Sequence, residues 1–128
     1  MSKILRVYLA SPHRSDDPAK RAEYAALNKR LCRWVTRHGK GKLFPVSPHA
    51  LTEHLVPEDM PEEYYMAGVM EVCLSCPVMI AFGESEGVIK EFKAHDALYG
   101  SSRQWWLSFC RENDIASACR YFLDIMNL

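Results

Sequence analysis

The feature that most constrains the fold is an uninterrupted apolar run, Val78–Phe82, which lies between two segments of helical periodicity. A strand that is apolar at every position is typical of a parallel sheet with helices on both faces. Pro77 precedes the run and Gly83 ends it, so turn-forming residues bound it on both sides. We therefore expect Val78–Phe82 to be a central strand of an α/β protein.

Strand and helix patterns alternate along the rest of the chain. Residues 4–10 are rich in β-prone apolar side chains and stop at a proline. Asp17 and Pro18 then supply a helix start, and apolar residues recur at helical spacing as far as His38. The remaining patterns predict strands at Leu43–Val46 and residues 103–109, a loop at 47–57, and helices at about 60–76, 88–98 and 115–126.

This alternation with short connections favours a mostly parallel sheet of four or five strands, because each helix returns the chain to the same end of the sheet. We expect a small Rossmann-like or flavodoxin-like three-layer sandwich. The 128 residues, 48% of them apolar, are enough for one domain that spans residues 1–128. Ligands bind at the carboxyl ends of such strands, so the loops at 11–17, 47–58 and 83–87 are the expected site.

Charge is uneven along the chain, although its formal net value is zero. Residues 1–45 hold eleven basic and three acidic residues, and most of the basic ones fall at helical spacing, which is typical of a solvated helix face. The sequence has no basic stripe with interleaved aromatic residues, which is the pattern typical of a nucleic-acid-binding surface. We therefore expect no nucleic-acid partner. The apolar runs are too short to span a bilayer and the first residues do not resemble a signal peptide, so we expect a cytoplasmic protein with no membrane partner.

Five cysteines without a secretory context predict reduced thiols. Cys73 and Cys76 have the CxxC spacing of zinc and redox sites, but no second CxxC and no histidine at ligand spacing accompanies them. Two small buried residues at a helix end explain the pair better, so neither a metal nor a cofactor is expected. Trp105 and Trp106 are either a stacking platform for a base or, as we favour, part of the core or of a subunit interface.

The expected rim of the sheet carries groups suited to an anionic ligand. Ser85 and Gly87 precede a helix whose free N–H groups favour a phosphate, although an ordinary turn has the same local pattern. Glu91 follows one helical turn later and can lean back toward the loop. Arg14 can bind a phosphate with two hydrogen bonds, and Ser11 can add a donor. His13 and His49 are further candidates at this rim, and each is either a ligand contact or a surface histidine.

These residues resemble the nucleoside 2-deoxyribosyltransferase superfamily, which includes the 2-deoxynucleoside 5-phosphate N-hydrolases. The resemblance covers about residues 4–100. Its most specific part is Ser85-x-Gly87-x-x-x-Glu91 after the third strand, and the segments that accompany it are Val-Tyr8-Leu-Ala-Ser-Pro-His-Arg14, Pro45-Val-Ser-Pro48, Ala67-Gly-Val-Met and Ala81-Phe-Gly, with Ala94.

The resemblance implies cleavage or transfer of the N-glycosidic bond of a nucleoside or nucleoside 5-monophosphate. It implies that Glu91 is the nucleophile, that Tyr8 orients it, and that Ser85 and Arg14 bind the 5-phosphate. A carboxylate suits this chemistry because the sugar develops oxocarbenium character, as in retaining glycosidases. The resemblance also implies a homo-oligomer, a dimer or larger.

One departure from the family pattern concerns the acid that protonates the departing base. The family has an aspartate in the second helix, at a position that falls near Met70 in this chain. Glu71 is the nearest acid, and it is either a substitute for that aspartate or a surface residue. A catalytically silent nucleotide-binding module is therefore the alternative function, and a purely structural oligomer is a third possibility.

Overall fold

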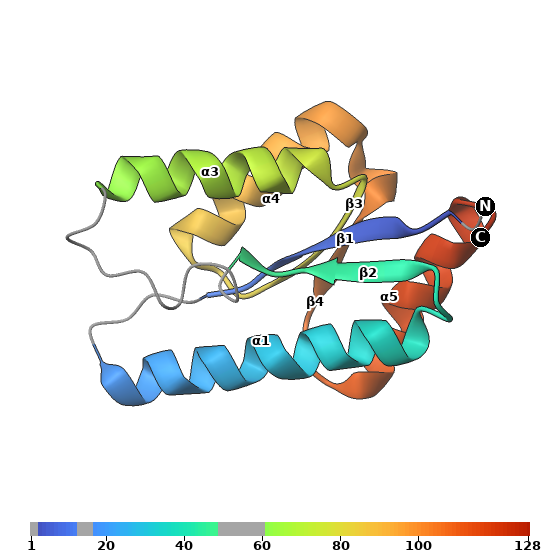
Figure 1. Ribbon diagram of the computed structural model, residues 1–128, viewed down its shortest axis with the longest axis horizontal. Helices are drawn as coiled ribbons and strands as arrows, with labels where there is room; N and C mark the ends of the chain where they lie inside the picture. Colours follow the sequence, from blue (N-terminus) through green and yellow to red (C-terminus); the bar gives the residue numbers. More distant parts are fainter. Residues whose placement is uncertain (1–2, 13–16, 49–60) are drawn as a thin grey trace.

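The computed structural model describes residues 3–12, 17–48 and 61–128 (Figure 1). Strands and helices alternate as the sequence predicts, and one 3₁₀ turn precedes the last strand. The elements are β1 (Leu5–Ala10), α1 (Pro18–His38), β2 (Leu43–Val46), α3 (Glu62–Ser75), β3 (Val78–Phe82), α4 (Glu86–Tyr99), η1 (Ser101–Arg103), β4 (Gln104–Leu107) and α5 (Glu112–Ile125).

The four strands form one parallel sheet in the order β2-β1-β3-β4. Helices α1 and α5 pack against each other on one face of the sheet, and α3 and α4 lie on the other face (Figure 1). The structure therefore confirms the predicted α/β fold, a small three-layer sandwich with a parallel sheet. No helix in the described ranges is long and apolar enough to cross a membrane.

Side chains of β1 alternate between two cores, because successive residues of a strand point to opposite faces. Leu5, Val7 and Leu9 belong to the core beneath α1 and α5. Tyr8 and Ala10 belong to the core beneath α3 and α4. The four residues from Val78 to Ala81 are all buried, as expected of a central strand that is covered on both faces.

Several element boundaries differ from the sequence-based expectation, and the start of α5 differs most, because this helix begins at Glu112 instead of residue 115. The last strand ends at Leu107 instead of residue 109, because its partner β3 ends at Phe82, opposite Leu107, and offers no further pairing. Helix α4 begins at Glu86, two residues earlier than expected, because the side chain of Ser85 accepts a hydrogen bond from the N–H group of Val88 and caps the helix.

A buried polar network connects α4 to the sheet. Nε2 of His95 lies 2.9 Å from the carbonyl oxygen of Cys76, and Nδ1 lies 3.3 Å from Nε2 of Gln104. Because a carbonyl oxygen only accepts, the ring donates through Nε2 and accepts at Nδ1. Nε2 of Gln104 also donates to the carbonyl oxygen of Phe92 at 2.7 Å. A neutral His95 therefore joins the end of α3, the middle of α4 and the start of β4.

Candidate functional site

The chain changes direction between β1 and β3. From β1 it passes outward to β2, and it then returns across β1 to form β3. In sheets of this kind, ligands bind beside the carboxyl ends of the two strands at which the order reverses. The residues that follow β1 and β3 therefore mark the place where a site is expected.

The segments that follow these two strands are in close contact. Gly83, directly after β3, has φ +88°, and a Cβ atom there would lie 2.6 Å from Cγ of Pro12, which follows β1. The backbone conformation and this proximity both require glycine. This contact fixes the turn from β3 to α4, and hence the position of the first turn of α4.

Tyr8 and Glu91 approach each other on the α3 and α4 face of the sheet. Tyr8, in β1, is completely buried, and Glu91, in the second turn of α4, is partly buried. Burial raises the pKa of Glu91 to about 7, and the Tyr8 hydroxyl group partly offsets that rise because it favours the ionised carboxylate. Burial and then the charge of Glu91 raise the pKa of Tyr8 above its ordinary value, so its phenol stays neutral.

The Tyr8 hydroxyl group is available to this carboxylate. Its oxygen is buried, and no acceptor in the described part of the chain meets full hydrogen-bond geometry with it. The two groups thus form no complete hydrogen bond, although the hydroxyl group is near enough to lower the pKa of Glu91. Catalytic hydrogen bonds are often loose without a ligand and tighten when substrate binds.

Cys73 is a further neighbour of Glu91, and the sequence analysis did not include it in the site. It is buried on α3, and its thiol donates to the backbone carbonyl oxygen of Glu91, with Sγ 3.8 Å from that oxygen. Burial, and after it the charge of Glu91, raises the pKa of Cys73 to about 12, so the thiol stays protonated. Cys76 is also buried, forms no disulfide and is the C-cap of α3, which confirms that this CxxC pair lies at a buried helix end.

Ser85 is the N-cap of α4 and Gly87 lies in its first turn, nearly two turns and about one turn before Glu91, respectively. The Ser85 oxygen already accepts from the N–H group of Val88, but its own proton remains free to be donated to an anion. A Cβ atom on Gly87 would meet nothing within 4 Å, so its backbone is open to the approach of a ligand. The structure therefore places Ser85, Gly87 and Glu91 along the N-terminal half of α4.

Ser11 lies on the opposite face of the sheet. Its buried hydroxyl group donates to Oδ1 of Asn28 at 2.8 Å, and the hydroxyl group of Ser47 donates to the same oxygen at 3.1 Å. Asn28 thus connects α1 to the ends of β1 and β2. Asn28 falls among the apolar residues that α1 buries. A polar residue at such a position indicates a buried hydrogen bond, and this was the signal in the sequence for the link to Ser11.

Glu71 is not brought to Glu91. It is exposed on α3, whereas Val69, Val72 and Cys73 form the face of that helix that packs against the core containing Tyr8. Glu71 points away from this face, as expected from its helical spacing relative to those residues. The other three candidate contacts, His13, Arg14 and His49, lie outside the described residues.

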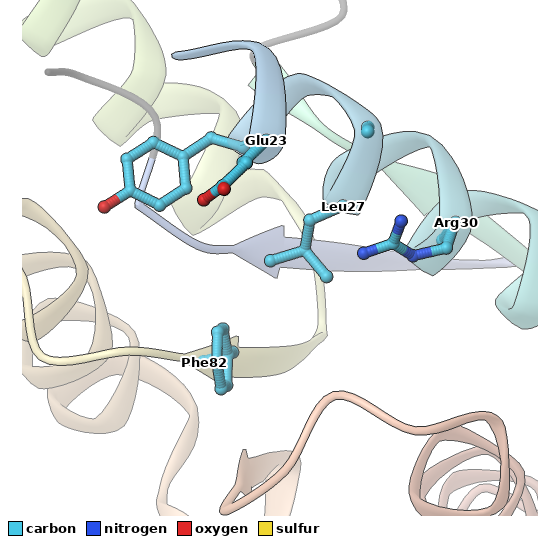
Figure 2. A pocket seen from close by; sticks show the side chains of 6 residues that line it. Glu23, Leu27, Arg30 and Phe82 are labelled. Carbon is cyan, nitrogen blue, oxygen red and sulfur yellow. The ribbon is translucent and has the colours of Figure 1, made fainter. Parts of the chain in front are cut away.

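A separate hollow of about 490 Å³ opens on the α1 side of the sheet. Figure 2 shows the side chains of Glu23 and Arg30 on either side of Leu27, with the Phe82 ring facing them from the end of β3. Phe82 packs with the core beneath α1 and α5, whereas Glu91 lies above the other face. The hollow is therefore distinct from the Tyr8 and Glu91 pair.

Comparisons of the chain with protein-family models, with curated proteins and with solved structures each find no significant match. A functional argument therefore depends on the geometry of the chain's own residues. Among the described residues, that geometry brings Tyr8, Cys73, Ser85 and Gly87 to the neighbourhood of Glu91. A search of the same described ranges finds no cluster of histidine, cysteine and carboxylate groups that could hold a metal ion.

Proposed function

We propose that this protein cleaves or transfers the N-glycosidic bond of a nucleoside or nucleoside 5-monophosphate, with Glu91 as the nucleophile. The observation that carries the proposal is the pairing of a partly buried carboxyl group with a buried tyrosine hydroxyl group beside the carboxyl ends of β1 and β3. A perturbed carboxyl group at the point where the strand order reverses has the character of a functional group.

In the first step the carboxylate of Glu91 attacks C1 of the sugar, a glycosyl ester forms, and the bond to the base breaks. The Tyr8 hydroxyl group donates to one carboxylate oxygen and directs the other toward the sugar. In a hydrolase, water then attacks C1, the ester bond to Glu91 breaks, the carboxylate is regenerated and the proton of the water passes to solvent. In a transferase, a second nucleobase attacks C1 in place of water and gives up its proton in the same way. The departing base must gain a proton in the first step, and Glu71 is not placed to supply it.

A substrate that carries a 5-phosphate is favoured over a free nucleoside. The start of α4 presents Ser85 and the unobstructed backbone of Gly87 one to two turns before the nucleophile. Backbone N–H groups at a helix N-terminus and a serine hydroxyl group both suit a phosphate. Arg14 is the cation that we expect to complete this phosphate site.

One observation favours the alternative, a catalytically silent nucleotide-binding module. The outward position of Glu71 leaves the acid role in this mechanism unassigned among the described residues. Such a module would bind a nucleotide without breaking it. At 100 times its dissociation constant, a nucleotide would stabilise the protein by about 2.7 kcal/mol, which a thermal shift detects.

The decisive experiment incubates the protein with a panel of ribo- and deoxyribonucleoside 5-monophosphates and the matching nucleosides, and follows free base by chromatography. We expect release of base from at least one 5-monophosphate. Glu91→Gln keeps the size of the side chain and removes the nucleophile, so the rate should fall at least about a thousandfold. Glu86→Gln is the matched control, because Glu86 is an exposed glutamate on the same helix, and it should retain the rate.

Three results would change this conclusion. Release of base that persists in Glu91→Gln would remove Glu91 from the nucleophile role. A thermal shift with a nucleotide but no release of base would establish the silent module instead. The absence of both signals would contradict a nucleotide function altogether.

A further inference from the structure

The two edges of the sheet differ in their protection against pairing with another strand. The edge strand β2 contains Pro45, which has no N–H group to donate, and Lys42 directly precedes it. A proline and a lysine are common means of preventing an edge strand from pairing. The other edge strand, β4, is Gln104-Trp-Trp-Leu107, which has no proline, although Arg103 directly precedes it as Lys42 precedes β2.

The side chains at the β4 edge are apolar and incompletely covered. Trp106 is 39% exposed, and its ring packs edge-to-face on Phe92 of α4 with centroids 5.1 Å apart. Ile89, one helical turn before Phe92, is also exposed, and so is Phe109 beyond the end of the strand. Among the described residues, β4 pairs only with β3, so its outer backbone groups face away from the sheet.

We propose that two copies of this chain associate through antiparallel pairing of their β4 strands, around a two-fold axis at Trp106. The occupant of the edge is then a strand, because a strand can replace the water on a whole row of backbone N–H and C=O groups at once. A second copy supplies an identical unprotected strand. Two-fold interfaces in which the same patch meets itself are the commonest in homo-oligomers.

The alternation of side chains limits the register, and the exposure of Trp106 selects it as the residue on the axis. Two residues that lie opposite each other in an antiparallel pair point to the same side of the sheet. Because side chains alternate along β4, an even-numbered residue must lie opposite an even-numbered residue of the other copy, and an odd-numbered residue opposite an odd-numbered one. Trp106 points toward α4 and Trp105 toward α5, where it packs on Tyr121. Centring the axis on Trp106 therefore places Trp106 against its own copy and extends the aromatic pair with Phe92 across the interface.

The same register gives complementary chemistry at the ends of the pairing. At each end of the pairing, Arg103 of one copy, in the 3₁₀ turn before β4, comes near Phe109 of the other, which lies beyond the end of the strand. Phe109 is 61% exposed and already accepts one cation, since the guanidinium carbon of Arg111 lies 4.6 Å from its ring centre. A second arginine over the same ring adds a cation–π contact.

The size of the patch predicts a reversible dimer. The exposed parts of Trp106, Phe109 and Ile89, together with a four-residue strand, amount to a few hundred Å² per copy, compared with roughly 800 Å² per partner in a standard stable interface. Contacts of that size form weak complexes. We therefore expect dissociation in the micromolar range or weaker.

Sedimentation equilibrium of the full chain over a range of concentrations tests the proposal. The wild type should pass from monomer to dimer as its concentration rises to the millimolar range. Trp106→Lys, which places like charges against each other at the axis, should remain a monomer. Phe44→Lys is the matched control, because Phe44 is an exposed aromatic residue on the protected β2 edge, and it should dimerise like the wild type.

A second variant keeps the proposal testable if Trp106→Lys does not fold. Trp106→Cys places two thiols against each other across the axis, and an added thiol oxidant such as diamide converts them to an intermolecular disulfide while it is itself reduced. The crosslinked dimer should form much faster than with Phe44→Cys. Equal crosslinking rates, a wild type that is monomeric at every concentration, or a dimer that survives Trp106→Lys would each overturn the proposal.

Discussion

Glu91 has a carboxyl group whose ionisation is set by two opposing influences. Burial disfavours its charge and raises its pKa to about 7, and the Tyr8 hydroxyl group stabilises the charge and limits that rise. A glutamate nucleophile must be ionised, so any glycosidic activity should increase with pH through the neutral range. The carboxyl group of Glu91 thus titrates in a pH range in which an exposed glutamate would already be fully charged.

The first prediction at the residue scale concerns this ionisation. A ¹³C NMR titration of Glu91 should give a midpoint of about 7. Tyr8→Phe removes the hydroxyl group that favours the charged form, so the midpoint should move to higher pH. Tyr99→Phe is the control, because the Tyr99 hydroxyl group donates to the Leu74 carbonyl oxygen instead. A midpoint near 4.5 in the wild type would refute the burial argument.

Gly83 provides a second prediction at the same scale. Gly83→Ala would force a residue with a Cβ atom into a positive φ and against Pro12, so we expect a loss of about 2 kcal/mol or more in the free energy of unfolding. Gly87→Ala lies in a helix with open space around it and should be neutral, or stabilising by up to about 1 kcal/mol. Urea unfolding compares the two variants. Equal stability would show that the turn relaxes freely.

At the scale of elements, His95 gives a prediction for the pH dependence of stability. Burial lowers its pKa, and its hydrogen bond to the Cys76 carbonyl oxygen and the charge of Asp96 only partly oppose this effect. The unfolded chain therefore takes up this proton at a higher pH than the folded one. The contribution of His95 to stability is complete above the unfolded pKa of about 6.5 and is lost as the pH falls below it.

Urea unfolding between pH 8 and pH 5 measures this contribution. The free energy of unfolding of the wild type should fall over that range, and His95→Gln should show a smaller fall, because it has no group to titrate. The half-buried His38, which pairs with Glu112, provides the control, since His38→Gln leaves the buried network intact. The same fall in the wild type and in His95→Gln would place the titrating group elsewhere.

The existence and order of the elements were predictable, because long apolar patterns and strong turn residues mark them. Val78–Phe82 was predicted from its apolar run alone, and the start of α1 from Asp17 and Pro18. The end of β4 was not predictable, because a strand extends only as far as the strand it pairs with. That strand is β3, which is separated from β4 in the sequence by α4. Helix α4 began early because one hydroxyl group caps it.

The candidate site was predictable only in part. Ser85, Gly87 and Glu91 lie on one helix, so their relation followed from helical spacing in the sequence. The orientation of Ser11 toward Asn28 and the position of Cys73 beside Glu91 depend on which face of a strand or helix meets which neighbour. Local spacing does not contain that information, because the contacts join segments far apart in the chain.

At the scale of the whole molecule, the sheet separates two regions of different character. The Tyr8 and Glu91 pair lies on the α3 and α4 face, and the hollow between α1 and Phe82 lies on the other. The edges of the sheet are equally distinct, since β2 is protected against pairing and β4 is not. A dimer through β4 would extend the sheet without covering the carboxyl ends of β1 and β3.

The sequence by itself determined the fold class and the elements, because apolar periodicity, turn residues and helix starts are local properties. It also determined the chemical groups along the start of α4. Only the tertiary structure decided that a carboxyl group on α4 meets a phenol on β1, that Glu71 points away from both, and that β4 is an edge. These facts depend on the order of the strands and on burial, which arise when distant segments pack and lose contact with water.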